Sequence, residues 1–530
     1  MMVQAETESS SLERRGIGHW MERVLAECGQ ARANFDADAV HDLRVAIRRC
    51  RSMAEGFQSL DGDPTWKCVR NAGKAVFSEL GELRDTQVLL EWIERLKDEG
   101  PNVAERLRAH CRQREAALKA TAAQALDRFD TRRWRQWAPA LEARVERVGE
   151  SAGLFQVAAL ERWEAARVLH AKAIRNHTKR TWHELRIGIK KFRYVVENFL
   201  PDHHQRWGGD LKYLQDLLGE VHDLDVLWET ACRIRAFASG EERRRWYAAI
   251  ARERKRRVTA YREKMGGRHA LWQEWRRDLP AGEVLRKSVL RRFAVWAATL
   301  DPDPAHARKI TGFSLKLYDA LNRFNLLPAC HGDNPNGSGG SAGRARRQAE
   351  RVPHGDAVLP AAEADEVNPR DLLQAAALAH AVGSSLGAKA YHKRSRRLLE
   401  RLEVPPAWSA QDLRIAGLVA RYHRGALPAR QRQYAALGSK ARRLVDCLAG
   451  ILRLAESLDA PHHRAIRRIS VAQSGGRVEI LAEGYLPRSK QAEKIAAARY
   501  LCESACGVPI MMLPQRVLAN RKKKTGKLRG

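Results

Sequence analysis

Apolar residues recur at three- and four-residue intervals from about residue 11 to about residue 285. Proline is sparse in this stretch, and no alternating strand pattern is present. Because this interval is that of an amphipathic α-helix, the stretch is predicted to be helical almost throughout. Pro201 and the Gly208-Gly209 pair are expected to interrupt one long helix.

Helical periodicity continues from about 286 to 325 and returns between about 369 and 459. Residues 465–484 then contain two β-branched runs on either side of Ser474-Gly475-Gly476, which is a hairpin signal. A last helix is expected over residues 490–506. The fold class is therefore predicted to be mainly all-α, with one small β-hairpin.

Two long stretches lack helical periodicity. Residues 331–346 read HGDNPNGSGGSAGRAR, and the chain stays irregular to about 368, which is typical of a flexible insertion. The C-terminal run RKKKTGKLRG is basic and without apolar periodicity. The predicted organisation is an N-terminal tail (1–10), a helical domain (11–285), a second helical domain (286–513) with an insertion (331–368), and a basic tail (514–530).

The first helical domain contains an internal repeat. The segment HDLRVAIRRCR at 41–51 is matched by HELRIGIKKFR at 183–193. Downstream of the first segment, Lys74 and GELRD at 81–85 are matched by Lys212 and GEVHD at 219–223. We therefore predict two copies of one helical unit, at about 11–150 and about 151–285.

Each copy of the repeat places basic side chains along one side of a helix. The spacing i, i+3, i+7, i+10 puts them in one stripe, opposite an apolar face. Like charges one turn apart repel, but a linear polyanion along the stripe makes the arrangement favourable because its counterions are released. Arginine, which dominates, presents a planar fork to phosphate oxygens. The stripes are His41, Arg44, Arg48 and Arg51, and His183, Arg186, Lys190 and Arg193.

The overall charge agrees with such a partner. The chain has 95 Lys and Arg against 63 Asp and Glu, a net charge of +32. This excess favours a polyanionic partner, namely nucleic acid, an anionic membrane surface or another phosphate polymer. No apolar run approaches the roughly 18–20 residues that a membrane-spanning helix needs, so membrane insertion is not expected.

Cysteine usage and the N-terminus indicate a reducing compartment. The nine cysteines are scattered and form no C-x-x-C pair, so neither a disulfide framework nor a zinc ribbon is predicted. Residues 1–16 contain no apolar signal region. The expected localisation is cytoplasmic.

The two repeated blocks resemble the two halves of a CHAD domain. The resemblance implies a duplicated helical bundle whose basic central groove binds inorganic polyphosphate. Asp85 and Asp223 would hold cations in place, and the contact at the matched pair Arg84 and His222 is less secure. The polyphosphate-binding residues that the resemblance implies are His41, Arg44, Arg48, Arg49, Arg51 and Lys74 from the first half, and His183, Arg186, Lys190, Lys191, Arg193 and Lys212 from the second.

The second half of the chain carries another set of motifs. Residues 372–424 include LAHAVGSS and YHKRS, and residues 452–459 read LRLAESLD. With these pieces, residues from about 288 to 513 resemble the C-terminal helical domain of the exopolyphosphatase/guanosine-pentaphosphatase family, which is related to HD-type phosphohydrolases. The resemblance implies an HD-like helical domain that carries the hairpin.

The His-Asp pair that an active HD site requires reads His380-Ala381 here. Alanine has no lone pair to donate, so the carboxylate that would anchor divalent metals is missing. We therefore expect no catalysis, no cofactor and no bound metal, and a binding or dimerisation role for this domain. The remaining candidate ligands are His306, His380, His392, His423 and Asp459.

Three functions stay open at this point. The first is polyphosphate binding without turnover, at polyphosphate granules. The second is nucleic-acid binding, favoured by net charge and the basic tail, but the stripes lack interleaved aromatic residues and no reading motif is present. The third is a metal-dependent phosphohydrolase in the C-terminal half, which Ala381 disfavours. A homodimer is an additional partner hypothesis.

Overall fold

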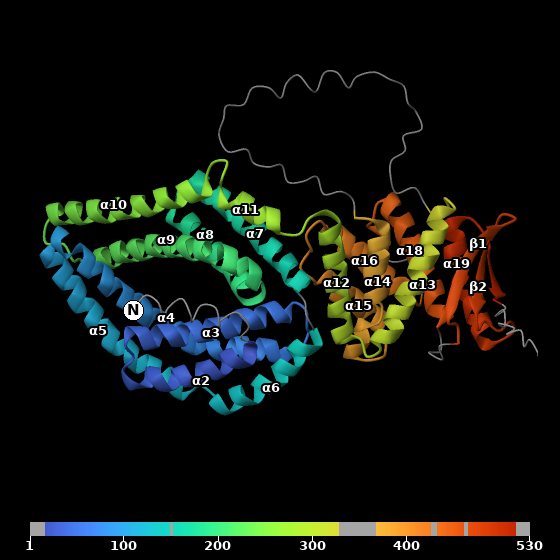
Figure 1. Ribbon diagram of the computed structural model, residues 1–530, viewed down its shortest axis with the longest axis horizontal. Coiled ribbons are helices and arrows are strands. Elements are labelled where there is room, and N and C mark those ends of the chain that lie inside the picture. The colour runs from blue at the N-terminus through green and yellow to red at the C-terminus, as the bar shows by residue number, and fades with distance from the viewer. Residues whose placement is uncertain (1–15, 149–151, 328–366, 426–431, 460–464, 516–530) are drawn as a thin grey trace, which may run out of the picture. The chain divides into compact units, whose positions relative to one another are not determined.

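The computed structural model describes residues 16–148, 152–327, 367–425, 432–459 and 465–515. The described residues form eighteen α-helices and one three-stranded sheet, so the expected all-α class is confirmed (Figure 1). The predicted N-terminal tail, and almost all of the predicted insertion and basic tail, lie outside these ranges. None of the helices in the described part of the chain is both long enough and apolar enough to cross a membrane.

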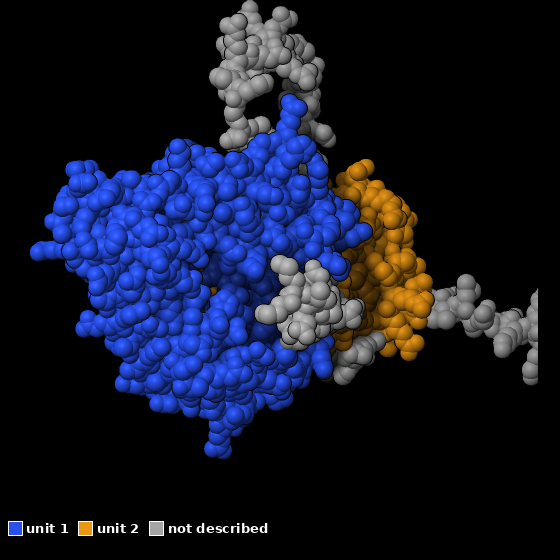
Figure 2. Space-filling view, turned by 60° about the vertical axis from the view of Figure 1, so that its left-hand side comes forward, with its two compact units in different colours: residues 1–289 blue, residues 290–530 orange. Residues whose placement is uncertain are grey.

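The chain divides into two compact units, coloured separately in Figure 2. Unit 1 comprises residues 1–289 and unit 2 residues 290–530. The division falls within helix α12 (Gly282–Leu300), whereas the sequence pattern places the boundary near residue 285.

Unit 1 is built from two successive sets of helices, which correspond to the two repeats. The first set is α2 (Ile17–Asn34), α3 (Ala37–Gln58), α4 (Pro64–Leu96), α5 (Pro101–Asp127) and α6 (Thr131–Val148). The second set is α7 (Ala152–Asn176), α8 (Lys179–Phe199), α9 (Pro201–Arg233), α10 (Gly240–Met265) and α11 (Leu271–Asp278). The repeated basic segments lie on α3 and α8, and the downstream blocks lie on α4 and α9, which are both 33 residues long.

Local sequence explains where the two repeat helices begin. The Asp36 carboxylate accepts hydrogen bonds from the first backbone N–H groups of α3, and the Thr178 hydroxyl does the same for α8. The apolar face of each helix is fully buried, with Leu43 on α3 and Leu185 on α8 both 0% exposed. Burial of this face turns the opposite, basic face of each helix away from the core.

One expected helix break is wrong. Pro201 does separate two helices, since it begins α9, where its missing N–H costs no hydrogen bond. The Gly208-Gly209 pair, however, lies inside α9. Tertiary packing of this long helix, with Trp207 and Leu211 buried around the pair, outweighs the roughly 1 kcal/mol that each glycine costs.

Unit 2 is a helical domain with a small sheet on α19. Its helices are α13 (Pro304–Arg323), α14 (Pro369–Ala379), α15 (Tyr391–Glu400), α16 (Ala410–Tyr422), α17 (Arg432–Ala435), α18 (Ser439–Leu458) and α19 (Lys490–Cys506). Helices α18 and α19 pack closely at Gly450, which lies against the backbone of Cys502. Only glycine fits at this position, because a Cβ on residue 450 would lie 2.7 Å from the Cys502 backbone nitrogen. The predicted helix over 490–506 is confirmed.

The predicted hairpin is also confirmed. Strands β1 (Arg468–Ser474) and β2 (Arg477–Glu483) pair antiparallel, and Gly475 and Gly476 adopt the positive φ angles that the turn requires. A third strand, β3 (Ile510–Pro514), pairs parallel to β2 and was not predicted. It is a five-residue apolar run whose partner lies far back in the chain, so no local alternation reveals it.

Candidate functional site

The two basic stripes of unit 1 come together. Helix α3 contacts α8, and α4 contacts α9. Burial and the charges of Arg186, Arg48 and Arg44 lower the pKa of Lys190 to about 8. Because Lys190 and Arg186 belong to the second repeat while Arg44 and Arg48 belong to the first, this interaction joins the two stripes. Figure 2 shows that the surface of unit 1 is hollowed near its middle.

Aromatic side chains support several of these cations. The guanidinium groups of Arg44 and Arg51 lie over the ring of Phe77, with Cζ 4.7 and 4.9 Å from its centroid. Arg48 lies over the ring of Tyr194 at 5.1 Å. Such cation–π contacts hold a guanidinium in place without neutralising its charge. Sequence reasoning missed both aromatic residues, although Tyr194 directly follows the second stripe.

Among the described residues, five cations have no carboxylate in direct ion-pair contact, and we call them the cationic cluster. Within the described ranges, none of the five takes part in an ion pair shorter than 4 Å. The Nε atoms of Arg48, Arg51 and Arg186 are buried, and no hydrogen-bond acceptor lies within reach in the described structure. Leaving such a donor unsatisfied costs about 1–3 kcal/mol, and Nε of Arg49 and Arg193 is unsatisfied as well, so it is the absence of a direct ion pair that distinguishes the cluster. The cationic cluster consists of Arg44, Arg48, Arg51, Arg186 and Lys190.

Two other predicted binding residues, Arg49 and the stripe residue Arg193, are engaged within the protein. The Glu197 carboxylate pairs with Arg49, and with Arg193 at 3.6 Å. Arg49 also donates to the Asn198 side-chain oxygen at 2.8 Å, and Asn198 donates to the Ser52 hydroxyl at 3.0 Å. These bonds link α3 with α8. The structure therefore gives Arg49 and Arg193 a role in holding the two repeats together.

Two carboxylates lie among the cations, as expected for Asp85 and Asp223. Burial raises the pKa of Asp85, and the charges of Arg44, Arg186 and Lys190 partly oppose this rise. Burial likewise raises the pKa of Asp223 to about 7. The charge of Arg186 lowers this pKa, whereas the negative charge of Asp85 raises it further. Each acid thus interacts with Arg186, and Asp85 interacts with cations of both repeats.

Two imidazoles of this region, His41 and His222, have lowered pKa values. Burial and the charge of Arg84 lower the pKa of His41. The rings of His183 and His222 lie 4.8 Å apart, and burial together with the charge of Arg186 lowers the pKa of His222 to about 4. His41 and His222 can therefore donate or accept single hydrogen bonds but add little positive charge.

The remaining predicted lysines are exposed. Lys74, Lys191 and Lys212 lie at the surface of α4, α8 and α9.

One glycine makes room for the cluster. A Cβ at Gly81 would lie 2.9 Å from a guanidinium nitrogen of Arg44, so Gly81 allows Arg44 to lie against α4. Arg44 also donates to the Phe77 carbonyl at 3.2 Å.

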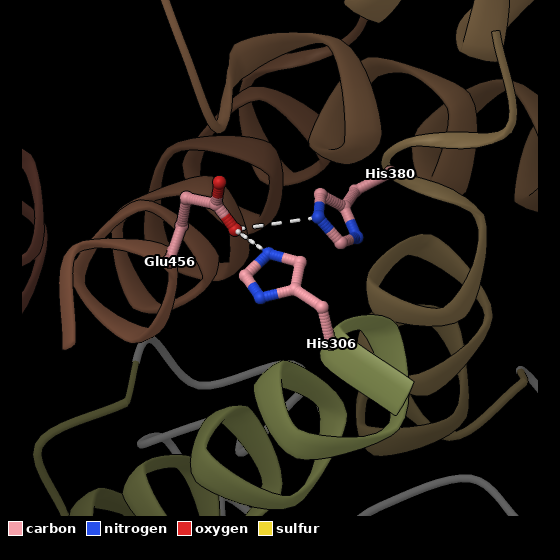
Figure 3. A group of neighbouring side chains, drawn as sticks. All are labelled: His306, His380 and Glu456. Atoms are coloured by element: carbon pink, nitrogen blue, oxygen red, sulfur yellow. Dashed lines mark hydrogen bonds and ion pairs between the residues drawn. The ribbon is translucent and has the colours of Figure 1, made fainter. Parts of the chain in front are cut away.

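A second group of polar side chains lies inside unit 2. The His306, His380 and Glu456 side chains come from α13, the end of α14 and α18, and meet at one point (Figure 3). Oε2 of Glu456 lies 3.1 Å from Nε2 of His306 and 3.3 Å from Nε2 of His380. Sequence reasoning missed Glu456, although it lies one helical turn before Asp459 on the same face of α18.

The surroundings of this group involve the other candidate ligands. Nδ1 of His306 lies 2.8 Å from Oδ2 of Asp459, and Nζ of Lys309 lies 2.5 Å from Oδ1 of the same carboxylate. Burial opposes a charge on His306, but Glu456 and Asp459 outweigh it and raise the pKa of His306 to about 9. The structure thus brings His306, His380 and Asp459 together.

His423 and His392 are more distant. The His423 ring lies 5.0 Å from that of His380, and its Nε2 is 3.2 Å from the Tyr391 hydroxyl. Burial and the neighbouring His380 lower the pKa of His423 to about 3. The centroid of the His392 ring lies 6.5 Å from that of His423, and His392 is not part of the group around Glu456.

Comparisons with known proteins divide the chain in the same two parts. No curated protein matches it. Among solved structures, the crystal structure of the CHAD domain from the plant Ricinus communis matches with 22% identity and a TM-score of 0.34, covering 51% of this chain and 90% of the other.

Two family models match the sequence. The first, the CHAD domain, matches residues 17–232, which include α3, α4, α8 and α9. The second, described as Ppx/GppA phosphatase, domain III, matches residues 342–480, which include His380 and Glu456. The chain thus contains a CHAD domain followed by a Ppx/GppA domain III.

Proposed function

We propose that this protein binds inorganic polyphosphate at the cationic cluster. A polyphosphate-related function agrees with the presence of both domains. The observation that carries the proposal is the set of arginine and lysine side chains from both repeats that form no ion pair shorter than 4 Å within the described ranges. A linear polyanion can satisfy donors of both stripes at once, and it gains affinity from counterion release.

The same geometry favours polyphosphate over nucleic acid. Proteins that bind single strands stack bases on aromatic rings. Here the rings of Phe77 and Tyr194 are covered by the guanidinium groups of Arg44, Arg51 and Arg48. A chain of phosphates needs only the charged edges of these arginines, whereas a base would have to displace them.

We propose further that the chain binds polyphosphate without turning it over, and that it is found in the cytoplasm at polyphosphate granules. Ala381 supplies no ligand where an HD-type site needs its carboxylate. Phosphate release from polyphosphate, measured with Mg²⁺ or Mn²⁺, is expected to stay at the background level. A metal-dependent rate above background that a His380 substitution abolishes would contradict this part of the proposal.

Competition between polyphosphate and DNA tests the binding partner. Unlabelled long-chain polyphosphate should displace a labelled polyphosphate probe from the full chain at about 150 mM salt. Duplex DNA at the same phosphate concentration should displace much less. If DNA competes equally well or better, the cluster recognises phosphate charge of any kind, and the polyphosphate assignment is wrong.

Binding is expected to weaken as the pH rises from about 6 to about 8.5. Below pH 7 Asp223 is neutral and Lys190 is charged; above pH 8 Asp223 carries a negative charge and Lys190 loses its positive one. The internal phosphates of a long chain remain charged throughout. A unit charge about 8 Å from the ligand contributes roughly 1–2 kcal/mol. The two changes together amount to roughly 2–4 kcal/mol, so we expect at least about a thirtyfold loss of affinity.

Asp223→Asn provides the control for this pH effect. The groups that act on Asp223 are Arg186 on α8, Asp85 and Arg84 on α4, and Glu220 on α9. The variant should bind about as tightly at pH 8.5 as the wild type does at pH 6, apart from the contribution of Lys190. An unchanged pH profile in the variant would show that Asp223 does not face the ligand.

A further inference from the structure

The group around Glu456 has the spacing of a metal site. In a tetrahedral site with metal–ligand bonds of about 2.0–2.1 Å, neighbouring ligand atoms lie about 3.3 Å apart. The two histidine Nε2 atoms lie 3.1 and 3.3 Å from Oε2 of Glu456. All three ligand atoms lie within 4.8 Å of one another, and both histidines are buried.

The outer hydrogen bonds orient both imidazoles toward the centre of this group. Nδ1 of His380 lies 2.7 Å from the Ala377 carbonyl oxygen, which can only accept a hydrogen bond, so Nδ1 carries a proton. In a neutral ring the lone pair of Nε2 then faces the Glu456 carboxylate. Two electron-rich atoms 3.3 Å apart repel unless a proton or a metal ion lies between them.

His306 is oriented in the same way. Its Nδ1 is directed at the Asp459 carboxylate, which Lys309 holds from the other side. Metal-bound histidines usually donate their second ring N–H to a carboxylate or to a backbone carbonyl, and these two histidines show one example of each. The arrangement is therefore more specific than a chance meeting of polar side chains.

We propose that His306, His380 and Glu456 bind one divalent transition-metal ion, through Nε2 of each histidine and Oε2 of the glutamate. Two imidazoles and one carboxylate are a donor set that suits Zn²⁺. Three protein ligands leave a fourth position for water or an anion. Glu456 supplies from α18 the carboxylate that Ala381 cannot provide, and the ion would connect α13, α14 and α18.

Metal titration of the full chain tests this inference. After treatment with a chelator, the protein should bind one equivalent of Zn²⁺ in calorimetry. One equivalent of Co²⁺ should give visible bands of a nitrogen- and oxygen-ligated ion, without the charge-transfer band of a cysteine-ligated one. Binding of less than about a tenth of an equivalent, or a thiolate spectrum, would overturn the proposal without any variant.

Three variants locate the site. Glu456→Gln keeps the side-chain volume and His380→Ala removes a nitrogen ligand, and each should lower the Zn²⁺ affinity at least a hundredfold. Asp459→Asn, which alters the contacts to His306 and Lys309 but removes no proposed ligand, should lower it about 10- to 100-fold. Unchanged affinity in both Glu456→Gln and His380→Ala would place the metal elsewhere and refute the assignment.

His392→Ala is the matched control within unit 2. Its ring lies near His423 but outside the proposed ligand set. The variant should bind Zn²⁺ as the wild type does, within about twofold. A tenfold loss would show that the ligand set is different from the one proposed. The unfolding temperature of each variant is measured with and without Zn²⁺, since an ion that binds the folded chain raises it.

Discussion

Replacing Arg48 and Arg186 together by glutamine is expected to weaken polyphosphate binding at least about a hundredfold. Neither guanidinium forms an ion pair shorter than 4 Å within the described ranges, and one comes from each repeat. A hydrogen bond to a charged group contributes about 1.5–3 kcal/mol, so losing two amounts to roughly 3–6 kcal/mol. The change is measured by fluorescence anisotropy of a labelled polyphosphate at fixed salt.

The control removes the same total charge from another part of unit 1. Arg180 and Arg245 are 86% and 63% exposed and lie beside Glu184 and Glu241. Their joint replacement by glutamine should change the affinity by no more than about twofold to threefold. Equal losses in the two double variants would mean that polyphosphate responds to overall charge, and that no defined binding site exists at the cluster.

The helices that carry the cluster could be predicted because their signal is local. Leu43 and Leu185 recur with the helical period, and the repetition of the basic segment shows that α3 and α8 are equivalent. The stripes themselves follow from spacing along one helix. The hairpin was equally accessible, since its two strands and its glycine turn are adjacent in the chain.

What the sequence did not reveal depends on contacts between helices. Phe77 and Tyr194 support arginines, and Glu197 neutralises Arg49, but no spacing along a single helix indicates which side chain meets which across a helix pair. Glu456 was missed for the same reason, because its partners lie on α13 and α14. A stripe of cations therefore predicts a binding face, and only packing separates its free members from its paired ones.

Glu197→Ala is expected to lower the free energy of unfolding of unit 1 by about 3–5 kcal/mol. Its side chain is 6% exposed and lies between Arg49 and Arg193, which are 15% and 12% exposed. Removing the carboxylate leaves two half-buried cations beside each other without compensation, which is the costly way to break such a pair. Denaturant unfolding followed by tryptophan fluorescence measures this, since 12 of the 14 tryptophans lie in unit 1.

An exposed ion pair between the neighbouring helices gives the comparison. Glu229 is 64% exposed and accepts from Lys179 at 3.2 Å, so Glu229→Ala should cost no more than about 1 kcal/mol. A similarly small cost for Glu197→Ala would mean that Arg49 and Arg193 do not depend on Glu197. If Arg49 and Arg193 depend on Glu197, polyphosphate should stabilise the Glu197→Ala variant more than the wild type. The polyphosphate would then supply the negative charge that the substitution removes from between α3 and α8.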